Sequence, residues 1–314
     1  MTVHPFAIEI LQILLLIGTA PLFAGWVKTV KCRMQGRSYA GVFQPYRDIA
    51  KVFSKQVILA ENASWIFRMT PYIVFGVTVM IGGIIPFISV DLPFAATADV
   101  IALVMLFAII RFFTALAGMD IGTAFGGMGS SREMMIASLA EPAMLMAVFT
   151  VSLASNSTSL THMVGVMAHG DFILRPSLAF ALIAFIMVHL TETGRVPVDN
   201  PSTHLELTMV HEAMILEYSG RHLALIEWAG MMKLFIFSAL GIAVFCPWGI
   251  AVAGDPLGLL IGLGALAGKL AVLGVIMVLI ETGMAKMRLF RLTEYLGSAF
   301  LLATLGMLSF FILE

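Results

Sequence analysis

Eight long apolar runs decide what this chain can fold into. An α-helix needs about 20 apolar residues to cross a bilayer, and each run is close to that length. The runs cover 6–27, 71–90, 100–119, 133–153, 176–193, 223–247, 257–281 and 295–313. The segments between them leave no room for a soluble domain. We therefore predict an all-α integral membrane protein of about eight transmembrane helices, in a single transmembrane domain that fills residues 1–314.

The composition agrees with a chain embedded in lipid. Hydrophobic residues make up 60% of the 314 and charged residues only 12%, whereas soluble domains carry about 25% charged residues. The net charge of -1 gives no sign of nucleic-acid binding, and the N-terminus lacks the basic segment of a cleaved signal peptide. The two cysteines, Cys32 and Cys246, are too few for a metal or iron–sulfur site, so we expect no redox centre and no metal on this chain.

The basic residues predict how the chain is oriented. The segment 28–70 holds eight Lys and Arg residues, and alternation of the helices places six more on the same side, against Arg175 alone on the other. Since cytoplasmic loops of membrane proteins are rich in Lys and Arg, we predict that segment 28–70 is cytoplasmic and both termini face outward. The expected location is the inner (cytoplasmic) membrane, with multiple passes.

Segment 28–70 is too polar to span the bilayer. Its residues Val42, Tyr46, Ile49, Val52 and Phe53 recur at helical spacing among basic residues. This pattern predicts an amphipathic helix on the cytoplasmic interface, with a proline near its start, where proline suits a first turn. The helix serves either as a lipid anchor or as a docking surface for a partner.

Ionisable residues inside the apolar runs are the strongest functional signal. Each costs about 2.5–3.5 kcal/mol in the membrane centre, so such residues face protein or water and tend to be functional. Arg111 and His189 are two such residues. Several glutamates are also inside the runs, and carboxyls in apolar surroundings can relay protons. We predict an ion path through Glu133, Glu141, Glu192, Glu227, Lys233, Lys269 and Glu281. The alternative is that buried acids paired with bases only hold the helices together.

The loop over 194–222 is the most polar predicted cytoplasmic segment. Its charges are too dense for a simple connector. The stretch 211–215 has isoleucine where the HExxH zinc motif needs its second histidine, so we predict no zinc site there. The glycine-rich stretch 122–129 matches no phosphate-binding loop, and we interpret it as a flexible connector between helices.

The order of these features resembles one family, the subunit 1 family of respiratory complex I, which is shared with membrane-bound energy-converting NiFe hydrogenases and formate hydrogenlyase. The resemblance covers nearly the whole chain. Its motifs are Arg33-Met34-Gln35 with Arg37, Gln44, Asp48 and Lys51, then Glu192-Thr193-x-Arg195-x-Pro197-x-Asp199, Glu206-Leu207 and Glu217-Tyr218-Ser219-Gly220.

Other motifs resemble the hydrogenase and formate hydrogenlyase branch, of the hydrogenase-4 type. They are Phe67-Arg68-x-x-Pro71, Arg111-Phe112-Phe113, Gly118-x-Asp120, Ser131-Arg132-Glu133, Glu141-Pro142 and Glu281-x-x-Met284-Ala285. In the loop, Ser202 and His204 stand where the family usually has glutamates, which argues against a quinone role.

The resemblance implies a non-catalytic membrane subunit of a multi-subunit oxidoreductase. Its partners would be hydrogenase-like large and small subunits, an iron–sulfur subunit and antiporter-like membrane subunits, with the NiFe and iron–sulfur clusters on those partners. This chain would anchor the peripheral redox arm and link electron transfer to proton or Na⁺ translocation. The expected arm contacts are Arg33, Arg37, Asp48, Lys51, Arg195, Asp199, Glu206, Glu217, Tyr218 and Arg221.

Three alternatives stay open. The first is a quinone-linked complex I relative, or a hydrogenase-related complex without nickel. The second is a free-standing secondary transporter, although we see no pair of Gly- or Pro-broken helices at the midplane. The third is a passive anchor with no role in ion movement.

Overall fold

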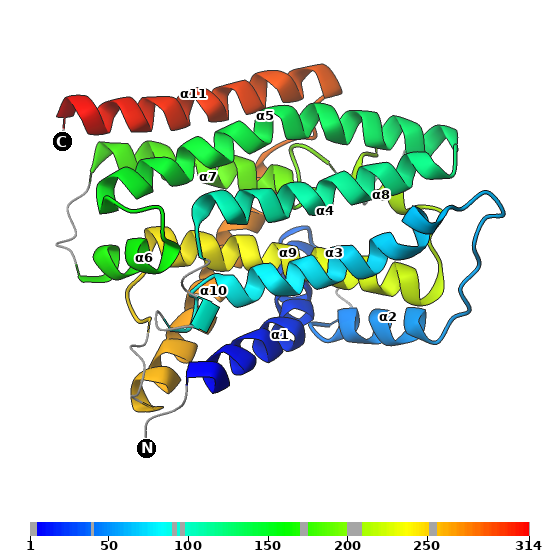
Figure 1. Ribbon diagram of the computed structural model, residues 1–314, viewed down its shortest axis with the longest axis horizontal. Coiled ribbons are helices and arrows are strands. Elements are labelled where there is room, and N and C mark those ends of the chain that lie inside the picture. The colour runs from blue at the N-terminus through cyan, green and yellow to red at the C-terminus, as the bar shows by residue number, and fades with distance from the viewer. Residues whose placement is uncertain are drawn as a thin grey trace.

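Helices make up almost all of the ordered secondary structure in the computed structural model (Figure 1). The structure describes residues 5–38, 41–89, 93–94, 98–169, 175–199, 209–250 and 256–313. Within these ranges the only β-type pairing is an isolated bridge between Asp99 and Ser159. The predicted arm contact Glu206, and also Ser202 and His204, lie outside the described residues.

Seven of the helices are long and apolar enough to cross a membrane. They are α1 (Pro5–Met34), α3 (Trp65–Ile84), α4 (Val100–Asp120), α5 (Ala124–Ser155), α9 (Gly220–Phe245), α10 (Pro256–Gly283) and α11 (Leu289–Leu313). An eighth apolar helix, α7 (Pro176–Glu192), has 17 residues, which is about the minimum for a span. The prediction of an all-α membrane protein of about eight transmembrane helices is confirmed.

Three shorter helices complete the chain: α2 (Gln44–Phe53), α6 (Leu160–His169) and α8 (His211–Ile215). Helix α2 matches the predicted amphipathic helix. Its residues Pro45 and Ile49 are buried, whereas Arg47 and Lys51 are exposed. Pro45 lies in the first turn, as its fixed φ angle favours. Helix α6 had no signal in the sequence that distinguished it from a connection between two spans.

Helix α2 packs closely against α1 because Gly25 lies at the crossing. A Cβ atom at Gly25 would come within 1.9 Å of the carbonyl oxygen of Val42, so no larger residue fits without moving α2. The hydroxyl of Tyr46 donates to the carbonyl oxygen of Gly18, about two turns before Gly25 in α1. The interfacial helix is thus fixed to the membrane bundle at two points.

Two helices are longer than the apolar runs predicted. Helix α1 continues to Met34, because Lys31 and Arg33 in its last turn suit the negative end of the helix dipole. Helix α5 begins at Ala124, so the interpretation of 122–129 as a flexible connector is wrong beyond residue 123. The Thr123 side chain caps α5 by accepting from Gly126 N, and a Cβ at Gly126 would lie 2.2 Å from the Gly118 carbonyl oxygen. These glycines allow close helix packing.

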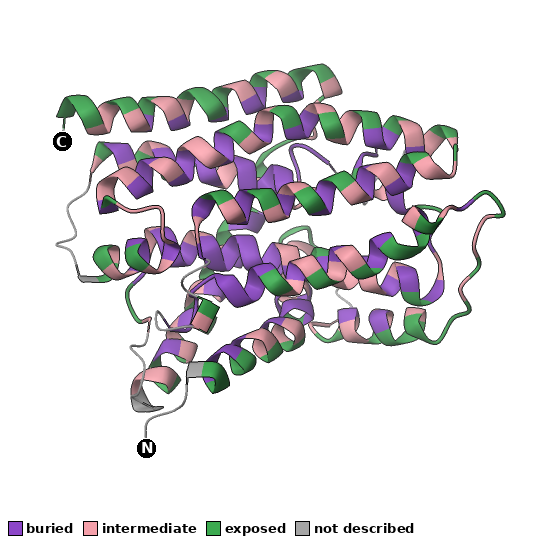
Figure 2. Ribbon diagram, in the orientation of Figure 1, coloured by how far each residue is buried: buried purple, intermediate pink, exposed green. Residues whose placement is uncertain are grey.

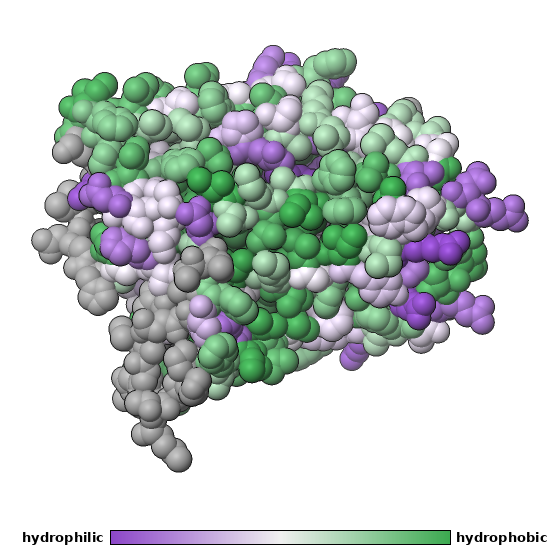
Figure 3. Space-filling view, viewed as in Figure 1, coloured by the Kyte–Doolittle hydropathy of each residue, from purple (hydrophilic) through white to green (hydrophobic). Residues whose placement is uncertain are grey.

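Helix α9 forms the centre of the bundle. It contacts α1, α2, α3, α6, α7 and α10, and its apolar window is the most buried of all the candidate spans. Buried residues gather along α9 and the neighbouring helices in Figure 2, whereas α10 and α11 lie at the edge. A hydrophobic band crosses the middle of the molecule in Figure 3, with hydrophilic residues mostly toward the two ends. A lipid-facing surface is expected to look this way.

One end of the bundle collects the loops that the sequence analysis placed together. Helix α2, the α4–α5 turn and the starts of α3 and α9 lie at the right of Figure 1, whereas the start of α1 and the end of α11 lie at the left. We call the right-hand end the loop end. It includes Arg47 and Lys51 on α2, Arg68 near the start of α3 and Arg221 near the start of α9.

Candidate ion-coupling site

A buried arginine joins two glutamates inside the helix bundle. Arg111, on α4, is only 4% exposed. Its Nη1 lies 2.5 Å from Glu192 Oε1, and its Nη2 lies 2.7 Å from Glu141 Oε1. The three residues come from α4, α7 and α5, so the guanidinium ties three membrane helices together. Arginine can bind two carboxylates at once, because its planar guanidinium has several N–H donors in a fork. The single ammonium of lysine does not offer this geometry.

Glu192 has a second cation on its other side. Lys233 Nζ, on α9, lies 3.0 Å from Glu192 Oε2. The Glu192 side chain is almost completely buried, and an unpaired carboxylate in such a place would cost several kcal/mol, about 3–5 when one partner of a pair is removed. Two flanking cations, Arg111 and Lys233, balance the charge of Glu192. The unit of Arg111, Glu141, Glu192 and Lys233 is called here the central charge cluster.

The central charge cluster borders a cavity of about 410 Å³. Helices α1, α2, α3, α4, α5, α7, α8 and α9 all contribute to its wall. Its ionisable lining residues are Lys28, Asp48, Arg111, Glu133, Glu192, Arg195, His211, Glu212, Glu227 and Lys233. Apolar residues such as Val74, Ile110 and Ile226 fill the spaces between them. A cavity of this size and polarity has room for several waters, because one water occupies about 30 Å³.

Glu133 and Glu227 are lining acids that make no ion pair in the described part of the chain. Glu133 extends from α5, and Glu227 from α9, and no hydrogen bond or salt bridge joins either of them to another described residue. Both side chains are partly accessible, through the cavity surface that they line. They differ in this from Glu192, whose charge is already balanced. Carboxyls that are not held in an ion pair can take up and release protons or bind cations from water.

The structure brings together five of the seven residues predicted for the ion path. Glu133, Glu192, Glu227 and Lys233 line the cavity, and Glu141 adjoins it through Arg111. Lys269 is elsewhere: its Nζ donates to the carbonyl oxygens of Cys246 and Trp248, at the end of α9. Its ammonium therefore closes a helix C-terminus, a position that favours a cation.

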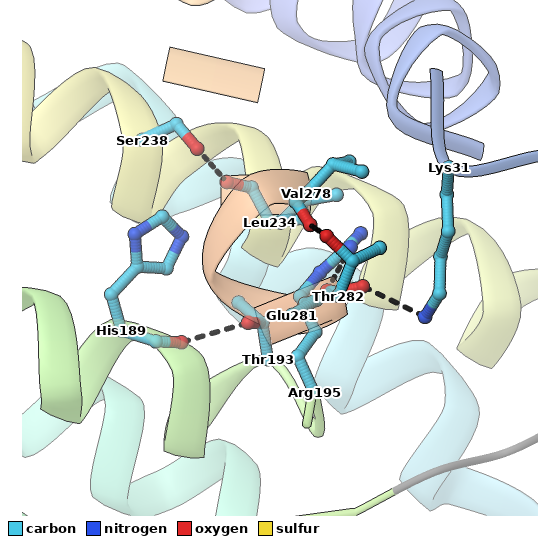
Figure 4. Close-up of polar contacts among 9 residues, drawn as sticks. All are labelled: Lys31, His189, Thr193, Arg195, Leu234, Ser238, Val278, Glu281 and Thr282. Atoms are coloured by element: carbon cyan, nitrogen blue, oxygen red, sulfur yellow. Dashed lines mark hydrogen bonds and ion pairs between the residues drawn. The ribbon is translucent and has the colours of Figure 1, made fainter. Parts of the chain in front are cut away.

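Glu281 belongs to a second cluster beside the cavity (Figure 4). Its Oε1 lies 2.6 Å from Arg195 Nη1, and its Oε2 lies 2.7 Å from Lys31 Nζ. These contacts join the end of α10 to the end of α1 and to the loop after α7. Arg195 also lines the cavity. We call Lys31, Arg195 and Glu281 the loop-end triad.

His189 lies between the two clusters. Its ring stacks on Phe237, with centroids 5.7 Å apart and an interplanar angle of 16°. Its backbone carbonyl accepts from the hydroxyl of Thr193, one turn on, which shapes the end of α7 next to Glu192 (Figure 4). His189 Nε2 is buried and has no hydrogen-bond partner among the described residues.

Some cavity residues were missed by sequence reasoning. Arg111 was noticed as a charge inside an apolar run but was not placed in the ion path. Lys28, His211 and Glu212 gave no signal that separated them from neighbouring loop charges. His211 is exposed along the cavity that it lines. The protein around it keeps bulk water away, and this desolvation, followed by the charge of Lys233, lowers the pKa of His211.

The expected arm contacts divide into three groups. Arg33, Arg37, Lys51, Glu217 and Arg221 are exposed. Asp48 and Arg195 line the cavity.

Asp199 and Tyr218 are buried and have partners within the chain. Asp199 Oδ2 accepts from the backbone N–H groups of Val210 and His211, and Lys286 Nζ lies 3.3 Å from its Oδ1. Tyr218 stacks on Phe67, with ring centroids 3.9 Å apart, and donates to the Phe67 carbonyl oxygen. Burial raises the pKa of Tyr218, so the phenol stays protonated. Asp199 and Tyr218 therefore fix the loop over 194–222 through contacts within the chain, and their buried side chains are not available to a partner.

Within the described residues, no group of three or more His, Cys, Asp or Glu side chains is arranged to hold a metal ion.

Comparison with known proteins identifies the family. The family model described as NADH dehydrogenase matches residues 8–312. Formate hydrogenlyase subunit 4 of Escherichia coli is 33% identical over 89% of this chain and 90% of its own length. Hydrogenase-4 component C of Escherichia coli is 32% identical over 76% of this chain and 75% of its own length. NADH-quinone oxidoreductase subunit 8 of Rhodothermus marinus is 29% identical over 69% of this chain and 64% of its own.

A solved structure has the same fold. A chain of the membrane-bound sulfane sulfur reductase, an archaeal respiratory membrane complex, superposes with a TM-score of 0.83 at 20% identity. The match covers 98% of this chain and 99% of the other. The described helices, the family match and the relatives agree: this chain belongs to the NADH dehydrogenase family of membrane subunits, in the branch represented by formate hydrogenlyase subunit 4 and hydrogenase-4 component C.

Proposed function

We propose that this chain is the membrane subunit of an energy-converting NiFe hydrogenase or formate hydrogenlyase-type complex. It docks the peripheral redox subunits at the loop end and links their electron transfer to translocation of protons or Na⁺. The NiFe and iron–sulfur clusters are carried by the partner subunits. The similarity to formate hydrogenlyase subunit 4 and hydrogenase-4 component C supports the type of complex.

The charged cavity is the observation that carries the coupling role. It extends from Asp48 on α2, at the loop end, to Glu133 on α5 and Lys233 on α9. Water in this cavity can connect acids whose carboxyls are not in contact. Glu227 and Glu133 are the carriers in this scheme, because neither makes an ion pair or hydrogen bond with another described residue. The central charge cluster supplies the field that their protonation states respond to.

The loop-end triad supports a route by which redox events reach the cavity. Arg195 contacts Glu281 and also lines the cavity, and it lies four residues before Asp199 in the loop. A shift of this loop on docking or reduction of a partner would move the Arg195 charge relative to Glu192. Moving a cation by even a few ångströms in a site of low dielectric changes the energy of nearby carboxylates by several kcal/mol, since about 4 kcal/mol acts between unit charges 4 Å apart at an effective dielectric constant of 20.

The proposed docking surface consists of the exposed residues Arg33, Arg37, Lys51, Glu217 and Arg221. Four of the five are basic, so the facing surface of the partner is expected to be acidic. A triple variant Arg33→Glu/Arg37→Glu/Lys51→Glu should release the peripheral subunits, while Arg291→Glu, an exposed basic residue outside this surface, should retain them.

Purification of the tagged chain in mild detergent tests the type of complex. Mass spectrometry of the co-purifying subunits and nickel analysis are the readouts. A NiFe large subunit with stoichiometric nickel is the expected result. A nickel-free complex with iron–sulfur subunits would contradict the hydrogenase assignment and favour a quinone-linked or nickel-free relative, and a chain that purifies alone would contradict the subunit role.

A further inference from the structure

A buried glutamate lies far from the cavity, near the other end of α1. Glu9 is only 3% exposed, and neither carboxylate oxygen has a hydrogen-bond partner among the described residues. The backbone N–H of Phe94 approaches this carboxyl. Glu9 precedes Ala24, the nearest cavity residue on α1, by 15 positions, which is about 22 Å along the helix. The ion path described above therefore does not explain Glu9.

Gln12, one turn further along α1, is completely buried beside the end of α3. Its Nε2 lies 3.0 Å from the carbonyl oxygen of Gly82, 3.3 Å from that of Gly83 and 2.9 Å from that of Ile85. These three carbonyls fix the orientation of the amide, because the flipped amide would place oxygen against oxygen. Gln12 Oε1 consequently points away from α3, and it has no hydrogen-bond donor among the described residues.

Acceptors outnumber donors at this place. An amide nitrogen carries two protons, whereas three carbonyl oxygens surround it. Gln12 Oε1 and both Glu9 oxygens add three buried acceptors that have no hydrogen bond to another described residue. Buried acceptors without donors destabilise the folded chain, because they lose their hydrogen bonds to water without replacement. A cation that these oxygens share removes this cost.

The end of α3 makes an empty site still less favourable for a carboxylate. Helix α3 ends at Ile84, and the carbonyl ends of a helix carry a partial negative charge. A Cβ at Gly83 would lie 3.8 Å from Glu9 Oε1, so the carboxyl is directly beside this last turn. A carboxylate is repelled there, whereas a cation is attracted both by the carboxylate and by the helix end.

We propose that Glu9, Gln12 and the carbonyl groups at the end of α3 form a binding site for a small monovalent cation, H⁺ or Na⁺. Oxygen ligands alone suit both, since a proton neutralises Glu9 and donates to a neighbouring oxygen, and Na⁺ takes several oxygens at once. Gly82 lets α3 pack tightly against α1 beside this site, because a Cβ at Gly82 would lie 2.0 Å from the Leu16 side chain. This site is independent of the cavity and of the proposed function.

Labelling of the purified native complex with N,N′-dicyclohexylcarbodiimide tests the site. The reagent modifies protonated carboxyls in apolar surroundings, and peptide mass spectrometry locates it. We expect Glu9 to be labelled in KCl at mildly acidic pH, with loss of labelling as pH rises. If NaCl at equal ionic strength suppresses the label, the occupant is Na⁺; if it does not, the occupant is H⁺. Absence of label on Glu9 at every pH would overturn the proposal.

Variants add a second measurement that does not depend on the reagent. The thermal midpoint of the native complex should rise with NaCl over KCl, or with falling pH, and Glu9→Gln should abolish this dependence. Glu61→Gln, an exposed acid, is the matched control and should keep it. If Glu9→Gln does not assemble, Gln12→Met, which changes no charge, should weaken the same dependence. An unchanged dependence in an assembled Glu9→Gln or Gln12→Met complex would contradict the proposal.

Discussion

Arg111 Nη1 lies 2.5 Å from Glu192 Oε1, and both side chains are withdrawn from solvent in the middle of the helix bundle. The same guanidinium reaches Glu141, while Lys233 reaches the other oxygen of Glu192. Four charges from four membrane helices therefore form one network. Its two positive and two negative members balance, which explains how a chain with so few charged residues keeps these inside the bundle.

Replacement of Arg111 should have the largest effect on assembly. Arg111→Leu leaves Glu141 without its cation and Glu192 with Lys233 alone, and removal of one member of a buried pair costs about 3–5 kcal/mol. We expect low yield and a lowered thermal midpoint of the purified complex. Arg111→Lys should be intermediate, because a single ammonium reaches one carboxylate well but not both. Wild-type stability of Arg111→Leu would contradict the network.

The loop-end triad predicts an asymmetry between its members. The Glu281 side chain is fully buried, whereas that of Lys31 is 25% exposed. Glu281→Leu leaves two cations without their shared acid and should cost about 3–5 kcal/mol. Lys31→Met keeps the Arg195 contact of Glu281 and should cost about 1 kcal/mol, near the value for partly exposed pairs. Chemical denaturation of the two variants in detergent checks this, and equal losses would contradict the assigned contacts.

Gly25 predicts a steric test of the interfacial helix. Gly25→Ala places a methyl group against the Val42 carbonyl and should push α2 away from α1. Gly18→Ala on the same helix is the matched control, because nothing lies within 4 Å of its Cβ position. Proteolysis of the segment that contains α2 should accelerate in Gly25→Ala only. Equal protease resistance of the two variants would show that the close contact is not needed.

The pH dependence of the loop should report on His211. Burial lowers the pKa of His211 below its ordinary value of 6.5 in the folded chain, so the unfolded chain binds the proton more tightly. The folded chain therefore loses stability as the pH falls below about 6.5. Above that pH, His211 does not change the stability. Compared with His211→Gln, the wild type should lose thermal stability between about pH 7 and pH 5. Parallel curves for the two proteins would exclude this effect.

The membrane spans were predictable because lipid imposes a simple rule on length and hydropathy. Charged residues are costly in lipid, so the sequence could indicate that a group of them is functional. This group is Glu133, Glu192, Glu227 and Lys233. The sequence could not reveal their partners. The Arg111–Glu192 contact joins residues 81 positions apart and depends on how α4 and α7 are rotated, which no local pattern encodes.

Misread residues have similar causes. Lys269 has the same apparent signal as Lys233, a lysine in an apolar run, yet it closes the end of α9. The glycines at 126 and 129 looked like a flexible connector because glycine marks both turns and tight helix packing. Only the neighbouring helices distinguish these roles.

Ion translocation in Glu133→Gln and Glu227→Gln tests the central claim most directly. Neither change breaks an ion pair of the described chain, so folding and docking should be preserved, and Glu294→Gln, an exposed acid on α11, is the matched control. In proteoliposomes or inverted vesicles with the whole complex, the measurement is the ion gradient formed per turnover of the redox reaction. The account predicts that both cavity variants keep redox turnover but lose coupled translocation by at least about tenfold. This loss corresponds to about 1.4 kcal/mol or more in the transfer step. The control variant should show no such loss. Wild-type coupling in both cavity variants would contradict an ion path through this cavity.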